Sequence, residues 1–132
     1  MEENLDKDWK NKTLLIAEDE DSNYKYLEIA LRKTRVNILR AKNGREAVSI
    51  SRDHPEIDLI LMDIKMPELN GLEATKEIKS FNSGISIVAL TAYAMANDKE
   101  MSIEAGCDDY ISKPVRRNRL FAVLSKYLDS EK

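Results

Sequence analysis

The fold is decided by LILM at residues 59–62, which Asp63 and the segment IKMPELNG at 64–71 follow. A short apolar run of this length is typical of a strand that is buried on both faces. Apolar residues at helical spacing come next, at 72–81, so the strand leads into a helix. A doubly buried strand followed by a helix is the unit of a parallel sheet that is covered on both sides.

The same unit repeats along the chain. Four further strands are predicted at 13–17, 36–41, 86–92 and 109–112, and four further helices at 22–33, 44–52, 96–105 and 118–128. Gly71, Gly84 and Gly106 mark turns and a helix end, where glycine allows a positive φ. Five strands that alternate with five helices predict an α/β fold, a doubly wound five-stranded parallel sheet with right-handed crossovers.

Composition describes one ordinary domain. The 132 residues suffice for a core without disulfides, and the net charge of -3 gives no basic excess to attract nucleic acid. No apolar run approaches the roughly 20 residues that span a bilayer, so we expect no direct membrane contact. Cys107 is the single cysteine, which agrees with a reducing compartment and a cytoplasmic location, and we interpret it as a small packed residue rather than a reactive thiol.

Hydrophilic residues stand where the predicted strands end. Ligands of an open parallel sheet bind at the carboxyl ends of its strands, beside the point where strand order reverses. Side chains from four strands should therefore converge on one edge of the sheet. These are Glu18, Asp19, Asp63, Thr91 and Lys113.

This set predicts a phosphoryl site with a metal ion. Three carboxylates a few Å apart repel one another unless a cation neutralises them, and oxygen-only ligands suit Mg2+, with Mn2+ as the alternative, rather than zinc. Lys113 can pair with one phosphate oxygen, and the Thr91 hydroxyl can bond another. Asp63, alone on the central strand, is the natural nucleophile toward phosphorus, whereas Glu18 and Asp19 are better placed to hold the metal.

These residues resemble the response-regulator receiver family. The segments LLIAEDEDSNYKYL, LILMDIKMPELNGLEA, IVALTA and AGCDDYISKPV match its blocks in order, over residues 12–130. The resemblance implies a flavodoxin-like sheet with strand order 2-1-3-4-5 and Asp63 as the phosphoacceptor. It also implies that Asp19 binds the metal directly, that Asp63 is a further metal ligand, that Glu18 acts through metal-bound water, and that the backbone carbonyl of Lys65 completes the ligands.

The resemblance further implies a conformational switch. The hydroxyl of Thr91 would move toward the phosphoryl group while the ring of Tyr110 turns inward, and Lys113 would contact the phosphate. Pro114 would follow Lys113 through a cis peptide. Glu18 departs slightly from the family pattern, in which Asp is also common at this position.

The implied function is two-component phosphorelay signalling. The domain would accept a phosphoryl group from a histidine kinase or a histidine phosphotransfer domain, catalyse its own transfer and dephosphorylation, and then switch conformation or relay the group. The partner would dock on the helix at 22–33 and the neighbouring loops. Lys65 and Tyr93, two residues after Asp63 and Thr91, would tune the phosphoryl lifetime.

A narrower resemblance points to receivers of hybrid sensor histidine kinases. Asn23 and the stretch LTAYAM match that group, and residues 1–11 are interpreted as a tail or linker remnant in which Trp9 packs against the domain. His54 is expected to be a solvated loop residue.

Two other functions stay open. A phosphatase of the haloacid-dehalogenase type also uses an aspartyl nucleophile, Mg2+ and a lysine, but it carries a second acid where Lys65 stands here. The other is a receiver-like scaffold that binds partners without phosphorylation.

Overall fold

Five parallel strands form one sheet in the order β2-β1-β3-β4-β5, as predicted. The computed structural model describes residues 7–92 and 96–129. The strands are β1 Thr13–Ala17, β2 Asn37–Ala41, β3 Leu59–Asp63, β4 Ser86–Thr91 and β5 Asp109–Ser112. The helices are α1 Asp21–Leu31, α2 Gly44–Asp53, α3 Gly71–Phe81, α4 Ala96–Ala105 and α5 Arg117–Leu128, with a 3-10 turn, η1, at Arg32–Thr34. None of the helices in the described ranges is long and apolar enough to cross a membrane.

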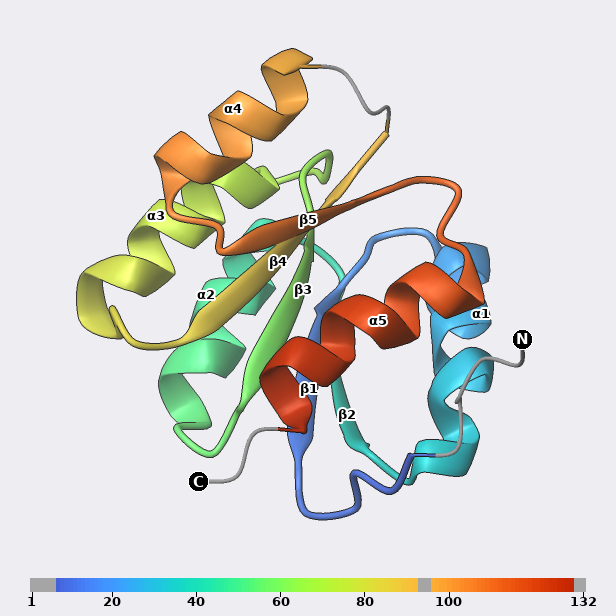
Figure 1. Ribbon diagram of the computed structural model, residues 1–132. Coiled ribbons are helices and arrows are strands. Elements are labelled where there is room, and N and C mark those ends of the chain that lie inside the picture. The colour runs from blue at the N-terminus through green and yellow to red at the C-terminus, as the bar shows by residue number, and fades with distance from the viewer. Residues whose placement is uncertain (1–6, 93–95, 130–132) are drawn as a thin grey trace.

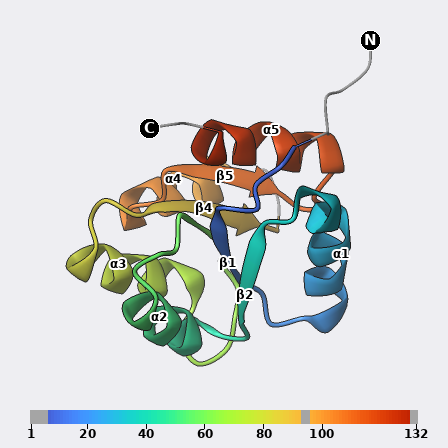
Figure 2. The ribbon, with the colours of Figure 1, turned by 90° about the horizontal axis from the view of Figure 1, so that it is seen from below.

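Helices cover both faces of the sheet (Figures 1 and 2). Helices α1 and α5 lie on one face, and α2, α3 and α4 lie on the other. Alternate residues of β1 divide between the two cores: Leu14 and Ile16 pack with α1 and α5, whereas Leu15 and Ala17 pack with α2 and α3. Because successive side chains of a strand point to opposite faces, a sheet covered on both sides needs strands that are apolar at every position.

The predicted elements shift only at their ends. Strand β2 begins at Asn37, one residue later than predicted, and β4 ends one residue earlier. The helix predicted at 22–33 stops at Leu31 and tightens into η1. The Thr34 hydroxyl donates to the Leu31 carbonyl at 2.6 Å, and Arg35 then takes a left-handed φ of 65°. A local side-chain bond and a left-handed residue therefore end this helix, which apolar spacing does not reveal.

Of the three glycines at which a positive φ was expected, one has it. Gly106 has a φ of 112°, and neither Gly71 nor Gly84 has a positive φ. At Gly71 glycine is needed for a different reason, because a Cβ atom there would collide with the backbone carbonyl of Asp63. The Gly71 N–H donates to the Ile64 carbonyl at 2.8 Å. Helix α3 can therefore begin directly against the end of β3, where Asp63 lies.

Trp9 anchors the segment before β1 against α5. Its side chain is 3% exposed, and its ring centroid lies 5.8 Å from that of Phe121. The indole N–H donates to Asp129 Oδ1 at 2.8 Å, and Lys7 pairs with Asp129 Oδ2 at 2.7 Å. The prediction that Trp9 packs against the domain is confirmed.

Replacing Trp9 with phenylalanine should lower the free energy of unfolding by about 1–2 kcal/mol, because the ring contact is partly kept while a half-buried hydrogen bond is lost. Urea unfolding of Trp9→Phe, Asp129→Ala and the double variant would measure the coupling between the two side chains, expected at about 1 kcal/mol. Additive effects of the two substitutions would contradict the role of this bond.

Candidate functional site

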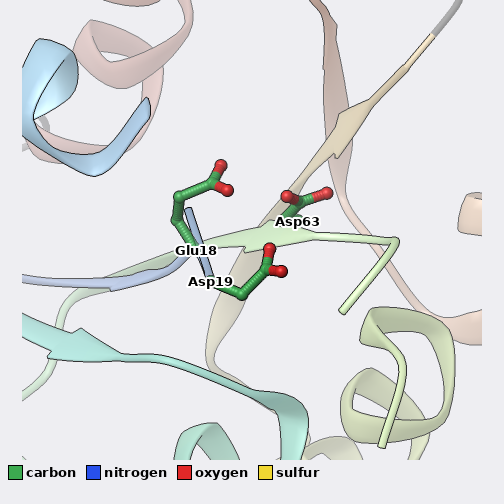
Figure 3. Close-up of side chains that lie close together, drawn as sticks. All are labelled: Glu18, Asp19 and Asp63. Atoms are coloured by element: carbon green, nitrogen blue, oxygen red, sulfur yellow. The ribbon is translucent and has the colours of Figure 1, made fainter. Parts of the chain in front are cut away.

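Three carboxylates meet where β1 and β3 end. Glu18 and Asp19 follow β1, and Asp63 is the last residue of β3. One oxygen from each residue lies within 4.8 Å of the others, and Figure 3 displays the three side chains together at the strand ends. The strands are neighbours in parallel register, with Ala17 beside Met62, so the residues that follow each strand become adjacent. The structure thus assembles the acidic cluster that the sequence predicts.

Glu18 is the most deeply buried of the three. Its side chain is 1% exposed, and its Oε2 accepts the N–H of Glu20 at 3.2 Å. Its Oε1 lies 3.4 Å from Lys113 Nζ but accepts no hydrogen bond from any residue that the structure describes. Burial, reinforced by the negative charge of Asp63, raises the pKa of Glu18 to about 7.

The acidic cluster fits a hard divalent cation. It offers only oxygen ligands, and the buried Glu18 Oε1 lacks a hydrogen-bond donor among the described residues. Buried polar atoms are normally satisfied, so such an oxygen beside two further carboxylates is suited to a metal ion. The residues present therefore fit Mg2+.

Asp63 is held by bonds to both of its carboxylate oxygens. Oδ2 accepts from Lys113 Nζ at 2.9 Å, and Oδ1 accepts the backbone N–H of Lys65 at 3.1 Å. Lys113 follows β5, two strands away from β3 in the sheet, so its long side chain spans β4 to reach the acids. That the Lys65 carbonyl binds a metal stays a prediction.

Lys113 is a cation held between two acids. Burial opposes its charge, but the hydrogen bond with Asp63 and the negative charges of Asp63 and Glu18 outweigh it and raise the pKa of Lys113. The ammonium group is therefore fully charged at neutral pH. The expected cis peptide joins Lys113 to Pro114.

Thr91 directly follows the residue of β4 that pairs with Asp63. Thr91 ends β4, next to β3 in the sheet, and its side chain is buried. Its Oγ1 has no hydrogen-bond partner among the residues that the structure describes. Tyr110, one strand further, is half-buried, and Lys99 Nζ lies 5.4 Å from its ring centroid. Tyr93 lies outside the described residues.

Two other candidates lie away from the site. His54 lies in the loop after α2, as predicted, with its side chain 41% exposed. Its Nδ1 lies 3.0 Å from Glu56 Oε2, a partner that the sequence did not indicate. Cys107 is buried, with its Sγ 3.7 Å from Thr75 Oγ1. The interpretation as a packed residue agrees with this burial, which also raises the pKa of the Cys107 thiol to about 11.

Sequence reasoning missed Arg40, which contacts the loop that carries Glu18 and Asp19. Its guanidinium donates two hydrogen bonds to the backbone carbonyl of Glu18. The available signal was an arginine inside the largely apolar segment VNILRA at 36–41. A charged residue in such a strand needs a partner nearby when it is buried.

A cavity of about 470 Å³ adjoins the acidic cluster and Lys113. It lies between α1 and the loop from β5 to α5. Its lining combines apolar side chains from both segments with the polar side chains of Glu18, Asn23 and Lys113. The lining residues are Glu18, Asn23, Tyr26, Leu27, Leu90, Lys113, Pro114 and Val115.

Comparisons with known proteins agree with this geometry. Residues 14–125 match the family model of the response regulator receiver domain. The polar-differentiation response regulator DivK of Brucella anthropi is 39% identical over 119 residues, which is 89% of this chain and 96% of that protein.

Solved structures match over a similar share of the chain. One is the co-crystal structure of the Saccharomyces cerevisiae histidine phosphotransfer signaling protein Ypd1 and the receiver domain of its downstream response regulator Ssk1, with a TM-score of 0.86, 34% identity and 90% of each chain covered. Another is the receiver domain of the sensor histidine kinase PA1611 from Pseudomonas aeruginosa PAO1, with a magnesium ion coordinated in its active site cleft. Its TM-score is 0.82 and its identity 34%, over 91% of this chain and 99% of that one.

Proposed function

The chain belongs to the response regulator receiver domain family of two-component signalling, and from that membership we propose that Asp63 is its phosphoacceptor and that Mg2+ binds beside it. The observation that carries the proposal is the position of Asp63 between two further acids and Lys113, whose Nζ lies 2.9 Å from Oδ2. Mn2+, which takes the same oxygen ligands, is the alternative metal.

The phosphoryl group would come from a phosphohistidine of a partner protein. An Asp63 carboxylate oxygen attacks phosphorus, the P–N bond breaks, and the imidazole leaves with the electron pair of that bond. Glu18, Asp19 and Asp63, with the Lys65 carbonyl, would hold Mg2+, which when bound supplies positive charge next to the transferred group. The Lys113 ammonium group would move from Asp63 to a phosphoryl oxygen and neutralise part of the negative charge of the phosphoryl group.

The conformational output would begin at Thr91. Its buried hydroxyl, which has no hydrogen-bond partner among the described residues, can donate to a phosphoryl oxygen on Asp63. Movement of Thr91 toward the phosphoryl group would open space for the half-buried ring of Tyr110 to turn inward. We assign these two residues as the switch pair on the family resemblance. Lys65, which lies directly beside Asp63, would tune the phosphoryl lifetime.

The partner would be a histidine kinase or a histidine phosphotransfer domain. Support comes from the likeness to a receiver that crystallised with Ypd1. The partner would approach over α1 and the cavity beside it, because that cavity reaches Glu18 and Lys113. We place the domain in the cytoplasm, with 12–130 as its receiver unit.

The wider protein context has two candidates. A hybrid sensor histidine kinase, our first hypothesis, is supported by the likeness to the PA1611 receiver. A free-standing regulator is supported by DivK, of whose length this chain covers 96%. Phosphohistidine is the donor in both. No observation favours the haloacid-dehalogenase alternative, since a lysine stands two residues after Asp63.

Incubation with acetyl phosphate and Mg2+ tests the proposal. We expect intact-protein mass spectrometry to detect one added phosphoryl group, which EDTA prevents and hydroxylamine removes because the product is an acyl phosphate. An unmodified wild-type protein under these conditions would favour the scaffold function instead.

A further inference from the structure

Three nitrogen atoms of Arg40, a residue of β2, contact the turn that leads from β1 into α1. Nε and Nη2 donate to the Glu18 carbonyl at 3.3 and 3.0 Å, and Nη1 lies 2.9 Å from Asp21 Oδ1. The ring of Tyr24 covers the guanidinium, with 4.5 Å from Cζ to the ring centroid. The Arg40 side chain is only 17% exposed. One side chain thus joins the end of β1 to the first turn of α1.

The Glu18 carbonyl needs this arginine because the strand ladder ends there. The Glu18 N–H still donates to the Ala41 carbonyl at 3.0 Å, but after that bond the chain leaves β2. A buried carbonyl without a hydrogen-bond donor destabilises the folded state, and the Arg40 guanidinium supplies two donors to this one. Both backbone groups of Glu18 are therefore fixed by consecutive residues of β2, and Asp19 lies between that anchor and the Asp21 ion pair.

We propose that Arg40 is a positioning residue of the metal site, which holds the turn from Glu18 to Asp21 so that the Glu18 and Asp19 carboxylates face Asp63. The inference rests on the proposed function of this site. Three clustered carboxylates repel one another. Without the contacts of Arg40 with the Glu18 carbonyl and Asp21, here called the Arg40 clamp, the turn would relax and the carboxylates would separate. The clamp keeps the carboxylates together before a cation arrives.

Simple electrostatics predicts the opposite effect of losing Arg40. The guanidinium is a positive charge close to the acidic cluster, and its removal should by itself strengthen the attraction for Mg2+. A positioning role predicts weaker binding, because the ligands must first be reordered. The sign of the change in Mg2+ affinity therefore separates the two roles.

Isothermal titration of the unphosphorylated protein with Mg2+ measures this sign. We expect Arg40→Gln to bind Mg2+ about 10-fold more weakly than wild type, a typical loss for residues that orient metal ligands. Arg40→Lys should be similarly weak, because a compact ammonium group cannot make the three contacts of the planar fork. The matched control is Arg52→Gln on α2, which loses a similar cation–π contact, with Phe81 at 4.4 Å, and should bind Mg2+ like wild type.

Affinity for Mg2+ in Arg40→Gln equal to or tighter than wild type would overturn the inference, as would full rescue by Arg40→Lys, which keeps the charge without the fork. Circular dichroism and urea unfolding establish that each variant is folded, and Arg40→Lys carries the test if Arg40→Gln is not. A wild-type protein that binds no Mg2+ would defeat the proposed metal site itself, whereas wild-type binding with an unaffected Arg40→Gln would defeat only the role of Arg40.

Discussion

Replacing Asp63 with asparagine should abolish phosphorylation of the chain. The amide is not a nucleophile toward phosphorus, so no acyl phosphate can form at this position. Removal of a nucleophile that forms a covalent intermediate lowers rates by factors on the order of 1000 or more. We expect no phosphorylated protein by intact-mass spectrometry after incubation with acetyl phosphate and Mg2+.

The Asp63→Asn protein should nevertheless fold normally. The side-chain oxygen can still accept the Lys65 N–H. The charged contact with Lys113 Nζ at 2.9 Å is weakened, and the repulsion with Glu18 is relieved. We expect its free energy of unfolding to lie within about 1 kcal/mol of the wild-type value, since the effects of the two changes oppose each other. Asp53→Asn, which alters an exposed carboxylate at the end of α2, is the matched control and should be phosphorylated like wild type. Undiminished phosphorylation of Asp63→Asn would place the acceptor elsewhere.

Replacing Glu18 with glutamine should stabilise the metal-free protein at pH 8 by about 2 kcal/mol. The folded state raises the pKa of Glu18 from 4.5 to about 7, so its carboxylate form is disfavoured in the fold. Each pKa unit corresponds to about 1.4 kcal/mol, which sets an upper bound of roughly 3.5 kcal/mol. Glutamine keeps the shape of the side chain and removes the charge.

The stabilisation should depend on pH with a definite sign. Between pH 4.5 and about 7 the folded wild type binds more protons at Glu18 than the unfolded chain does, so the contribution of this group to stability falls as pH rises. The advantage of Glu18→Gln should therefore be near zero at pH 4.5 and reach its full size above pH 7. Urea unfolding in EDTA across this pH range measures the difference in stability between Glu18→Gln and wild type. The control is Glu20→Gln, at an exposed residue nearby, whose difference in stability from wild type should vary little with pH.

Saturating Mg2+ should make the wild type more stable than Glu18→Gln, the reverse of their order in EDTA. The ion stabilises the wild type because it binds the folded state, and it binds Glu18→Gln more weakly, because the metal site loses one of its negative charges. Equal stability of both proteins in EDTA at pH 8 would contradict the burial cost assigned to Glu18. Equal Mg2+ affinity would contradict its place in the metal site.

The order and kind of the elements were predictable because they depend on local pattern. Runs such as LILM at 59–62 are apolar at every position, and that property alone requires a strand with both faces covered. The parallel strands then bring their carboxyl ends to one edge, so the meeting of Asp63 with Glu18 and Asp19 followed from topology before any distance was known. Element ends were less predictable, since the Thr34 hydroxyl and the left-handed Arg35 end α1 through contacts that apolar spacing does not encode.

The burial of the site residues and their long-range contacts could be seen only in the folded structure. The Lys113 contact with Asp63 spans 50 residues, and the Arg40 contact with the Glu18 carbonyl spans 22. Such distances depend on strand register and on how each helix packs, which periodicity leaves open. Residue types and their order therefore predicted a phosphoryl site at the carboxyl edge of a parallel sheet. The raised pKa of Glu18, its oxygen without a hydrogen bond among the described residues, and the Arg40 contacts arose from the packing of distant segments into one site.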